Sequence, residues 1–246
     1  MVNPLATLRQ TKLRIDKVEN VSVPPNTERT LFNRTGPGVV VSLWMALGGG
    51  AAPALDGRLR VYYDGSPTAA IDIDVGTLLA THWGAGSANT SHSCEHVHVE
   101  INSGNYLTAF LVTFPIPFGT SIKIAYFNIN AGQTASIYSM VTYSLTPTDE
   151  ANGRRLRYQG VRYVDQKVTR TASATTTLAQ ITGGPGSIVY HSYVGGVGAA
   201  NLSWLERNFS ITVDGEATPQ IVATGTERMS QTPWNFGGGP VIIRRR

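Results

Sequence analysis

Apolar and polar residues alternate over short stretches of this chain or gather into short apolar runs, and both patterns are typical of β-strands. The run at residues 39–47 is almost entirely apolar and has the length of a buried strand that carries Trp44. Glycine, asparagine and proline separate these stretches, as they do where tight turns join strands. Up to residue 145, the pattern predicts strands at residues 12–23, 27–33, 39–47, 59–64, 69–75, 96–102, 106–114, 121–130 and 136–145.

Helix signals are poor, and only residues 76–80 are expected to form a single helical turn. The segment at residues 115–119 contains two prolines, which lack the amide donor that a central strand needs, so we expect a rim or corner there. After residue 155, the pattern predicts strands at residues 166–171, 175–182, 187–193, 202–213, 220–223 and 241–245.

Three landmarks recur in the same order in the two halves of the chain. Gly36-Pro37-Gly38 returns as Gly184-Pro185-Gly186 after 148 residues, Asp64-Gly65 as Asp214-Gly215 after 150, and Trp83 as Trp234 after 151. The offsets differ by no more than a small loop insertion, which indicates one unit used twice. We therefore predict an N-terminal arm at residues 1–26, a first jelly roll at 27–146, a linker at 147–154 and a second jelly roll at 155–246.

About eight strands in a unit, joined by regular turns, predict an all-β fold of two tandem jelly-roll sandwiches, a double jelly roll. A pair of immunoglobulin-type sandwiches is the alternative, although the chain lacks the cysteines and the spacing of that fold. The single cysteine, Cys94, excludes an intramolecular disulfide framework. No apolar run reaches the ~18 residues of a membrane span, and the N-terminus has no signal-peptide pattern, so we expect cytoplasmic synthesis without membrane insertion.

Charged residues make up only 15% of the 246 residues. Low charge indicates a subunit whose neighbours cover part of its surface, and we expect a homo-oligomer, a trimer by the family resemblance described below. The net charge is +4, and the basic residues gather at the junction of the two units and at the C-terminus. Nucleic-acid binding would need basic residues interleaved with exposed aromatics on one surface, so this distribution disfavours it.

A histidine-rich run offers one candidate site. In a continuous strand, His92, Cys94, His96, His98 and Glu100 would share one face, because alternate residues point the same way. Imidazole and thiolate are ligands of zinc and other transition metals, so His92, Cys94, His96 and His98 are candidate metal ligands. The alternative is an exposed polar strand face. We expect the latter, with no metal and no cofactor, because no second set of ligands stands out.

Two glutamates offer another candidate site. Glu206 and Glu227 stand 21 residues apart in adjacent β segments. Glycoside hydrolysis needs two carboxylates, one as proton donor and one as nucleophile or base, and neighbouring strands can hold them at the required ~5–9 Å. Two surface glutamates across a sheet are also common in proteins that have no such activity.

Several short motifs resemble one enzyme family in their order and spacing. They are residues 33–44 with the glycine-proline turn, residues 60–65, residues 114–118, and the segments around Glu206, Asp214-Gly215 and Glu227. They are similar to the glycoside hydrolase family of difructose-dianhydride-forming and D-arabinofuranose-cleaving enzymes. The resemblance implies a double jelly-roll subunit that forms trimers or hexamers and is similar to viral double jelly-roll capsid proteins. It also implies an acid/base at Glu206 and a nucleophile at Glu227, and Trp83 and Trp234 are candidate substrate-binding residues.

The chain departs from this family beside both acids. Family enzymes continue with Gly-Asp-Glu after the first glutamate and Asp-Tyr after the second, whereas this chain has Arg207-Asn208-Phe209 and Arg228-Met229. The loss of acidic neighbours changes the carboxylate pKa values and the contacts to sugar hydroxyls, so we expect weak or absent hydrolysis.

Two functions remain open at this point. In the first, the chain is a structural or carbohydrate-binding component of a virus particle, a phage tail- or capsid-associated trimer that contacts neighbouring virion proteins and a cell-surface glycan. In the second, it is a glycosidase acting on furanose-containing glycans such as arabinan. We favour the first because the acidic site is eroded, charge is scarce and the basic segments suit docking. The expected location is the virion, after synthesis in the host cytoplasm, with the cytoplasm as the alternative.

Overall fold

The computed structural model describes residues 13–48, 57–79, 92–93, 96–102, 107–145, 177, 208–212, 215–219 and 221–224, and the findings below concern these residues. They are nearly all strand, which confirms the predicted all-β class. The one helix within these residues, α2 (Val75–Leu78), is a single turn where one was expected. No helix in the described ranges is long and apolar enough to cross a membrane.

The strands follow the predicted positions closely. In chain order they are β1 (Arg14–Val23), β2 (Glu28–Thr35), β3 (Gly38–Gly48), β4 (Gly57–Tyr63), β5 (Ile71–Asp74), β6 (His92–Ser93), β7 (Val97–Asn102), β8 (Leu107–Val112), β9 (Ile116–Phe118), β10 (Ser121–Asn128), β11 (Ala135–Ser144), β12 (Asn208–Ile211) and β13 (Ile221–Thr224).

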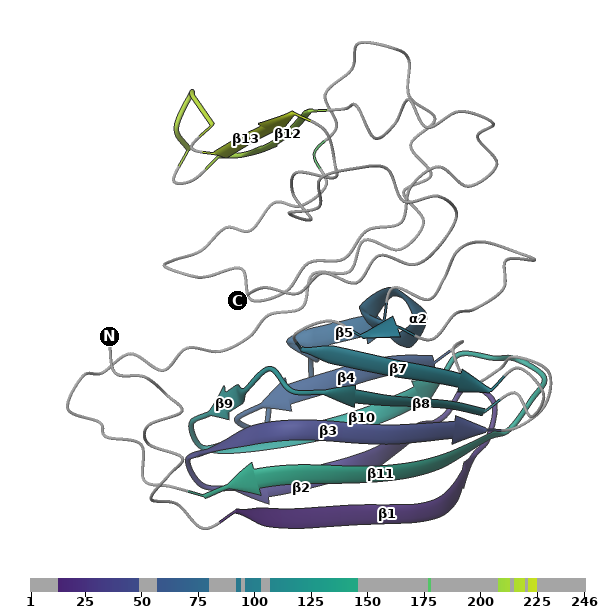
Figure 1. The fold of residues 1–246 in the computed structure, drawn as a ribbon. Helices are drawn as coiled ribbons and strands as arrows, with labels where there is room; N and C mark the ends of the chain where they lie inside the picture. The colour runs from purple at the N-terminus through teal and green to yellow at the C-terminus, as the bar shows by residue number, and fades with distance from the viewer. Residues whose placement is uncertain are drawn as a thin grey trace, which may run out of the picture.

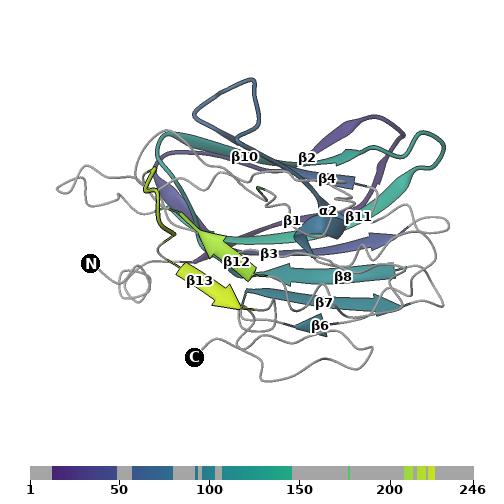
Figure 2. The ribbon, with the colours of Figure 1, turned by 90° about the horizontal axis from the view of Figure 1, so that it is seen from above.

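Two antiparallel sheets form two layers of a sandwich (Figure 1). Sheet A has the order β1-β11-β3-β8-β7-β6, and β9 also pairs with β3. Sheet B has the order β2-β10-β4-β5. The view from above separates the layers, with β3, β8 and β7 on one side and β2, β10 and β4 on the other (Figure 2).

The order of the strands is that of a jelly roll. When β6, β7 and β9 are set aside, the eight remaining strands up to β11 pair first with eighth, second with seventh, third with sixth and fourth with fifth. The pairs β11 with β3 and β10 with β4 complete the two sheets. This nesting divides an eight-stranded chain into two four-stranded sheets, as a jelly roll does. β7 and β6 then extend sheet A beyond β8.

Alternation along the strands builds the core between the sheets. On β10, Ile122, Ile124 and Tyr126 are fully buried, whereas Lys123 and Phe127 are only partly covered on the other side. Tyr126 lies against β4 at Gly57, where any Cβ atom would overlap the tyrosine ring. A glycine at this position therefore allows the largest fully buried side chain of the described core to fit.

The first sandwich includes the strand predicted at residues 12–23, which the predicted domain boundaries placed in an N-terminal arm. β1 starts at Arg14, ahead of residue 27 where the first jelly roll was expected to begin, and it pairs with β11 over most of its length. β1 is an edge strand with mostly exposed residues, so its alternation is weak. An edge strand of this kind is hard to distinguish from an extended arm by its sequence pattern alone.

The proline segment forms a corner, as expected, but it also contributes a short strand. β8 pairs with the second half of β3 and β9 with its first half, so the chain bends at residues 113–115 between them. Pro117 lies inside β9, opposite Val39. Within the described residues β9 pairs with β3 alone, and an edge position tolerates a residue that has no amide donor.

The hairpin β12–β13 matches the hairpin β4–β5 residue for residue. Arg58 pairs with Asp74 and Val61 with Ile71, and 150 residues later Asn208 pairs with Thr224 and Ile211 with Ile221. The turn glycines also match, because Gly65 has a φ of 72° and Gly215 a φ of 73°, a left-handed conformation that favours glycine. The other strands predicted for the second unit lie outside the described residues.

Candidate functional site

The candidate catalytic and sugar-binding residues Glu206, Glu227, Trp83 and Trp234 lie outside the described residues. The structure does describe the hairpin that stands between the two acids in sequence. β12 begins two residues after Glu206, β13 ends three residues before Glu227, and Asn208 pairs with Thr224. The described hairpin therefore stands between the two acids in the sequence, and its open end is the pair Asn208 and Thr224.

The strand predicted at residues 96–102 is β7, but the histidine-rich run does not continue it as one strand. β6 folds back on β7, pairing His92 with Val99 and Ser93 with His98. Residues 92–93 therefore belong to a different strand from His98 and Glu100. The sequence between the two strands, residues 94–96, contains no glycine or proline that would mark a turn. Cys94 lies outside the described residues, and His96 precedes β7.

What remains of the predicted pattern is the alternation on β7. Val97 and Val99 are buried, while His98 and Glu100 are exposed on the outer side of sheet A. Across the described ranges, no three His, Cys, Asp or Glu side chains come together as a metal site would require.

A network of paired charges covers the outer face of sheet B. Its centre is the carboxylate of Glu28 on β2, which accepts hydrogen bonds from the Tyr62 hydroxyl at 2.6 Å, Lys123 Nζ at 3.0 Å and Arg60 Nη1 at 3.1 Å. Asp72 on β5 accepts from Arg58 Nε at 2.5 Å and Arg60 Nε at 3.2 Å. The network therefore links all four strands of the sheet.

Two cations of this network also contact aromatic rings. The Arg60 guanidinium lies 4.0 Å from the centre of the Phe127 ring, and Lys123 Nζ lies 3.8 Å from the centre of the Tyr62 ring. Such cation–π contacts add about 0.5–2 kcal/mol each, depending on desolvation. The Arg58 side chain is only 7% exposed, and its ion pair with Asp72 offsets the cost of burying its charge.

The network holds Glu28 in its ionised form. Burial alone would raise the pKa of Glu28, but the hydrogen bonds from Tyr62, Lys123 and Arg60 outweigh it, so the pKa is lowered. Burial and the neighbouring Glu28 raise the pKa of the Tyr62 hydroxyl. A general acid needs the opposite, a carboxyl group whose pKa is raised toward the working pH. Glu28 is therefore unsuited to proton donation, and the network stabilises the fold.

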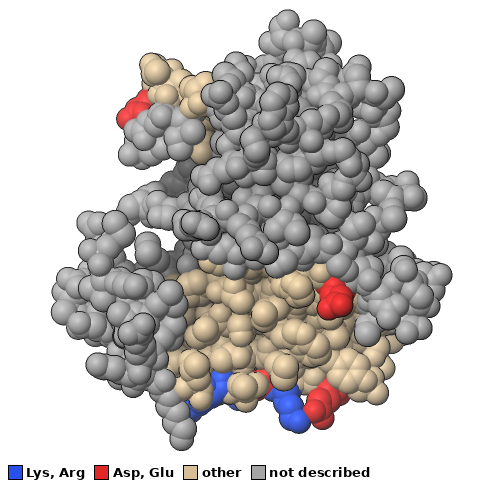
Figure 3. All heavy atoms as spheres, in the orientation of Figure 1, with Lys and Arg blue, Asp and Glu red and all other residues tan. Residues whose placement is uncertain are grey.

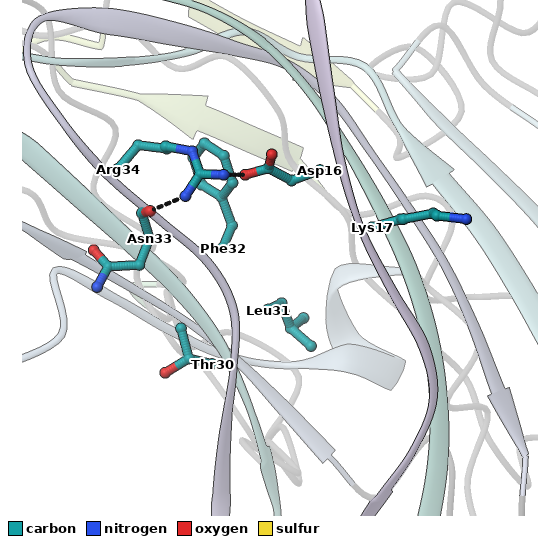
Figure 4. A pocket seen from close by; sticks show the side chains of 7 residues that line it. All are labelled: Asp16, Lys17, Thr30, Leu31, Phe32, Asn33 and Arg34. Atoms are coloured by element: carbon teal, nitrogen blue, oxygen red, sulfur yellow. Dashed lines mark hydrogen bonds and ion pairs between the residues drawn. The ribbon is translucent and has the colours of Figure 1, made fainter.

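A cavity of about 280 Å³ opens between β1 and β2, at the edge where the two sheets part (Figure 4). Its lining residues are Asp16, Lys17, Thr30, Leu31, Phe32, Asn33 and Arg34. Arg34 points across the gap toward Asp16, with which it forms an ion pair. Its Nε also donates to the Tyr143 hydroxyl at 3.1 Å, and its Nη1 to the backbone oxygen of Asn33 at 2.7 Å.

These contacts make Arg34 a strut between the sheets. Its guanidinium lies 5.7 Å from the centre of the Phe32 ring on sheet B and 5.6 Å from that of Tyr143 on sheet A. The hydrogen bond to Tyr143 is the main cause that raises the pKa of Arg34; burial lowers it and Asp16 raises it further. All three nitrogens of the guanidinium already have partners in the chain. Arg34 therefore links the two sheets at this edge.

A second cavity, of about 230 Å³, lies beside the charge network. Its lining residues are Asn33, Tyr62, Gly65, Ser66, Ser121, Ile122 and Lys123. The Lys123 ammonium and the Tyr62 hydroxyl are already bonded to Glu28. The cavity is polar, but it brings together no described acid and base that could move a proton.

The outer face of sheet A has the opposite character. One row of neighbouring residues crosses β1, β11, β3, β8 and β7, and it consists of Lys17, Met140, Trp44, Leu111 and His98. The next row consists of Tyr138, Ala46, Ala109 and Glu100. Both rows are apolar between their ends. Where it is visible, this face is an uncharged expanse with acidic and basic side chains only at its margins (Figure 3).

Sequence reasoning did not identify either outer face as a feature of the molecule. The signal was present in part, because alternation on β4 places Arg58, Arg60 and Tyr62 on one side of the strand. The partners of these residues come from other strands, however, and Lys123 and Glu28 are 95 residues apart.

Comparison with curated proteins finds no match. Among solved structures, the chain is similar to the crystal structure of the infectious bursal disease virus VP2 subviral particle, with 10% identity, coverage of 61% of this chain and 46% of that chain, and a TM-score of 0.19. The structure of the Gx strain of that virus gives 11% identity, 63% and 45% coverage, and a TM-score of 0.19. The chain spans less than half of each of these chains, and such low scores support no conclusion.

A family model gives a stronger result. The model described as the GH172 first beta-sandwich domain matches residues 15–151. This range contains most of β1 and all of sheet B, and it ends shortly after β11, so it coincides with the jelly roll of sheets A and B. The match covers more than half of the chain and agrees with the resemblance carried by its motifs. This chain belongs to the GH172 family.

Proposed function

We propose that this chain is a structural subunit of a virus particle, a double jelly-roll protein that assembles as a trimer in a phage tail or beside a capsid. The observation that carries the proposal is the outer face of sheet A, which is uncharged across β11, β3 and β8. Soluble single chains rarely leave a contiguous apolar face open to water, whereas subunits of assemblies have such faces covered.

The matching hairpins support the double jelly roll. β12–β13 repeats the register and the turn glycine of β4–β5 at a constant offset of 150 residues. In the first unit this hairpin forms the edge of sheet B away from β2. The second hairpin is the part of a second jelly roll that the same offset predicts.

The mass of the purified protein in solution tests the proposed assembly. Light scattering after size exclusion at micromolar concentration measures this mass. We expect three times the chain mass of 26.4 kDa, or a multiple of that trimer mass. A single-chain mass would contradict the proposal. Labelling of the protein in purified particles by a specific antibody then locates it within the virion.

An enzyme of the same family is the second candidate, and one observation favours it. Glu206 and Glu227 flank the hairpin β12–β13 in the sequence, and glycoside hydrolysis requires two carboxylates close together. Arg207 and Arg228 follow these acids directly, and a nearby cation stabilises the ionised form of a proton donor. We therefore expect little or no release of arabinose from arabinan. Release that is lost in both Glu206→Gln and Glu227→Gln would establish the enzyme instead.

A further inference from the structure

We infer that the outer face of sheet A binds the same face of a second copy of this chain about a twofold axis. The inference rests on the proposed assembly role and names the surface that serves it. It concerns the two rows defined above, which run from Lys17 to His98 and from Tyr138 to Glu100.

The composition of this face is that of the centre of a protein interface. Met140 is 41% exposed and Tyr138 39% exposed. Trp44 and Leu111 complete the first row between the charged or titratable ends. Aromatic residues and methionine are enriched at interface centres, where charged residues are depleted.

The size of the face also suits a stable contact. Strands lie roughly 4.8 Å apart and outward residues on one strand roughly 6.7 Å apart, so five strands and four outward residues on β11 span an area of roughly 20 Å by 20 Å. A standard interface buries about 800 Å² of accessible surface on each partner. The two rows can supply the apolar centre of such an interface, and the polar rim supplies the rest.

The order of side chains along the first row favours a second copy as the partner. Trp44 is at the middle, with Met140 on one side and Leu111 on the other. A twofold axis that lies between two such faces, along β3, places Trp44 on Trp44 and Met140 of each copy on Leu111 of the other. Closed twofold contacts require this self-complementarity, and sheets pack face to face with nearly aligned strands.

The ends of the rows agree with the same arrangement. The axis brings Lys17 of one copy to the edge that carries His98 and Glu100 of the other, so a cation approaches a carboxylate. Lys17 Nζ contacts Glu19 Oε1 at 2.6 Å within its own chain, and an ammonium group retains two further N–H donors. The axis also brings Glu19, which is bonded to Lys17, toward Glu100, and the Lys17 ammonium offsets this pair of like charges.

The same face is poorly suited to sugar. The residues around Trp44 on the two rows are Met140, Leu111, Ala46 and Ala109, which have no hydrogen-bonding side-chain groups for sugar hydroxyls. Apart from the Trp44 indole N–H, the polar side chains of these rows stand at their ends. A protein surface of matching apolar shape is therefore the better occupant.

Reciprocal charge substitution tests the contact. Met140→Glu and Leu111→Lys each place a charge in the contact, and we expect each to halve the number of copies in the wild-type particle measured by light scattering. In the double variant, the carboxylate introduced at position 140 would meet the ammonium group introduced at position 111 of the other copy. We expect the double variant to regain the wild-type mass, because this restoration needs the two positions to face each other across the twofold axis.

Control measurements separate assembly from folding. Thr30→Glu adds a charge at an exposed position of sheet B, and we expect it to keep the wild-type mass. All variants should keep the wild-type far-ultraviolet circular dichroism and a cooperative thermal transition. If a single variant unfolds, Met140→Gln replaces Met140→Glu and should weaken the assembly at least tenfold in dissociation constant.

The outcomes that overturn this inference differ from those that overturn the proposed function. A wild-type oligomer whose mass is unchanged by Met140→Glu and Leu111→Lys would overturn the contact alone. A double variant that stays at the lower mass would also overturn the facing arrangement. A wild-type monomer would overturn both. Loss of arabinan binding in Met140→Glu, with an unchanged mass, would show that the face binds sugar and that the inference is wrong.

Discussion

The two outer faces of one sandwich solve the problem of facing water in opposite ways. Sheet B places Glu28, Arg60, Asp72 and Lys123 on its outer side and pairs every one of them within the sheet. Sheet A places Met140 and Trp44 on its outer side, with charge only at the ends of the rows. Both faces belong to a single jelly roll with a common core.

The difference shows which face is complete within a single chain. Paired charges stay hydrated at their margins and satisfy one another, so sheet B needs no partner. An apolar face gains free energy when another surface removes it from water, at about 25 cal/mol per Å². In the assembly proposed above, sheet A is the face that a second copy covers, so substitutions on the two faces should differ in what they change.

The largest effect on folding is expected from Asp72→Ala on sheet B. This substitution removes the carboxylate that pairs with Arg58, whose side chain is almost fully buried and keeps its hydrogen bond to the backbone oxygen of residue 72. Breaking a buried ion pair costs about 3 kcal/mol or more. Thermal unfolding and urea titration measure the loss. Glu100→Ala removes an exposed acid at the edge of sheet A and serves as the control, with an expected change within about 0.5 kcal/mol. Equal losses in the two variants would show that the network does not distinguish the faces.

The next largest effect on folding is expected from Arg34→Ala, at the edge between β1 and β2. Arg34→Ala removes the ion pair to Asp16 and the contacts to the Phe32 and Tyr143 rings. We expect a loss of about 2 kcal/mol, because a charge-assisted hydrogen bond and two cation–π contacts disappear together. Arg29→Ala, at an exposed position on the same strand, is the matched control. A loss as large in the control would mean that the strut has no special role.

A pH-dependent effect is expected for Glu28→Gln. The folded-state pKa of Glu28 is lowered from its usual value of 4.5, so its ionised form stabilises the fold above pH 4.5. That contribution is lost as the pH falls through the lowered pKa. Wild type should exceed the variant by about 1 kcal/mol at pH 7, and the gap should close below pH 4.5. Melting temperatures from pH 7 to pH 3 measure this, and a constant gap over that range would contradict it.

The smallest effect on folding is expected from Tyr138→Thr on sheet A. Because the tyrosine is 39% exposed and lies outside the core, we expect a change within about 0.5 kcal/mol in the unfolding of the single chain. Chemical denaturation at a concentration low enough to keep chains apart measures this. The comparison of the two faces weakens if the loss approaches that of Asp72→Ala.

The strands were predictable because their signals are local. The apolar run at residues 39–47 became β3 (Gly38–Gly48), and the prediction at 121–130 became β10 (Ser121–Asn128). The reversal of the chain between β6 and β7 could not be predicted, because the sequence there has no glycine or proline. Local patterns report which residues alternate, whereas a change of direction without glycine or proline leaves the alternation intact.

The functional features of the surface were less predictable because they depend on pairing. The Glu28 network joins residues from β2, β4 and β10, with sequence separations of 32, 34 and 95 residues. Likewise, Met140, Trp44 and Leu111 become neighbours only when β11, β3 and β8 pair in one register. The glutamate pair Glu206 and Glu227 remains a prediction, since both lie outside the described residues.

The identical registers of the two hairpins have a consequence for the ancestry of the chain. A gene duplication would account for the offset of 150 residues in the turn and in the four residue pairs of this hairpin. The two copies then diverged unevenly. Leu59, Val61, Ile71 and Ile73 correspond to residues that are still apolar, whereas Arg58, Arg60, Asp72 and Asp74 correspond to Asn208, Ser210, Val222 and Thr224. The apolar positions thus kept their character and the charged positions lost theirs, so the two hairpins share a register but differ in charge.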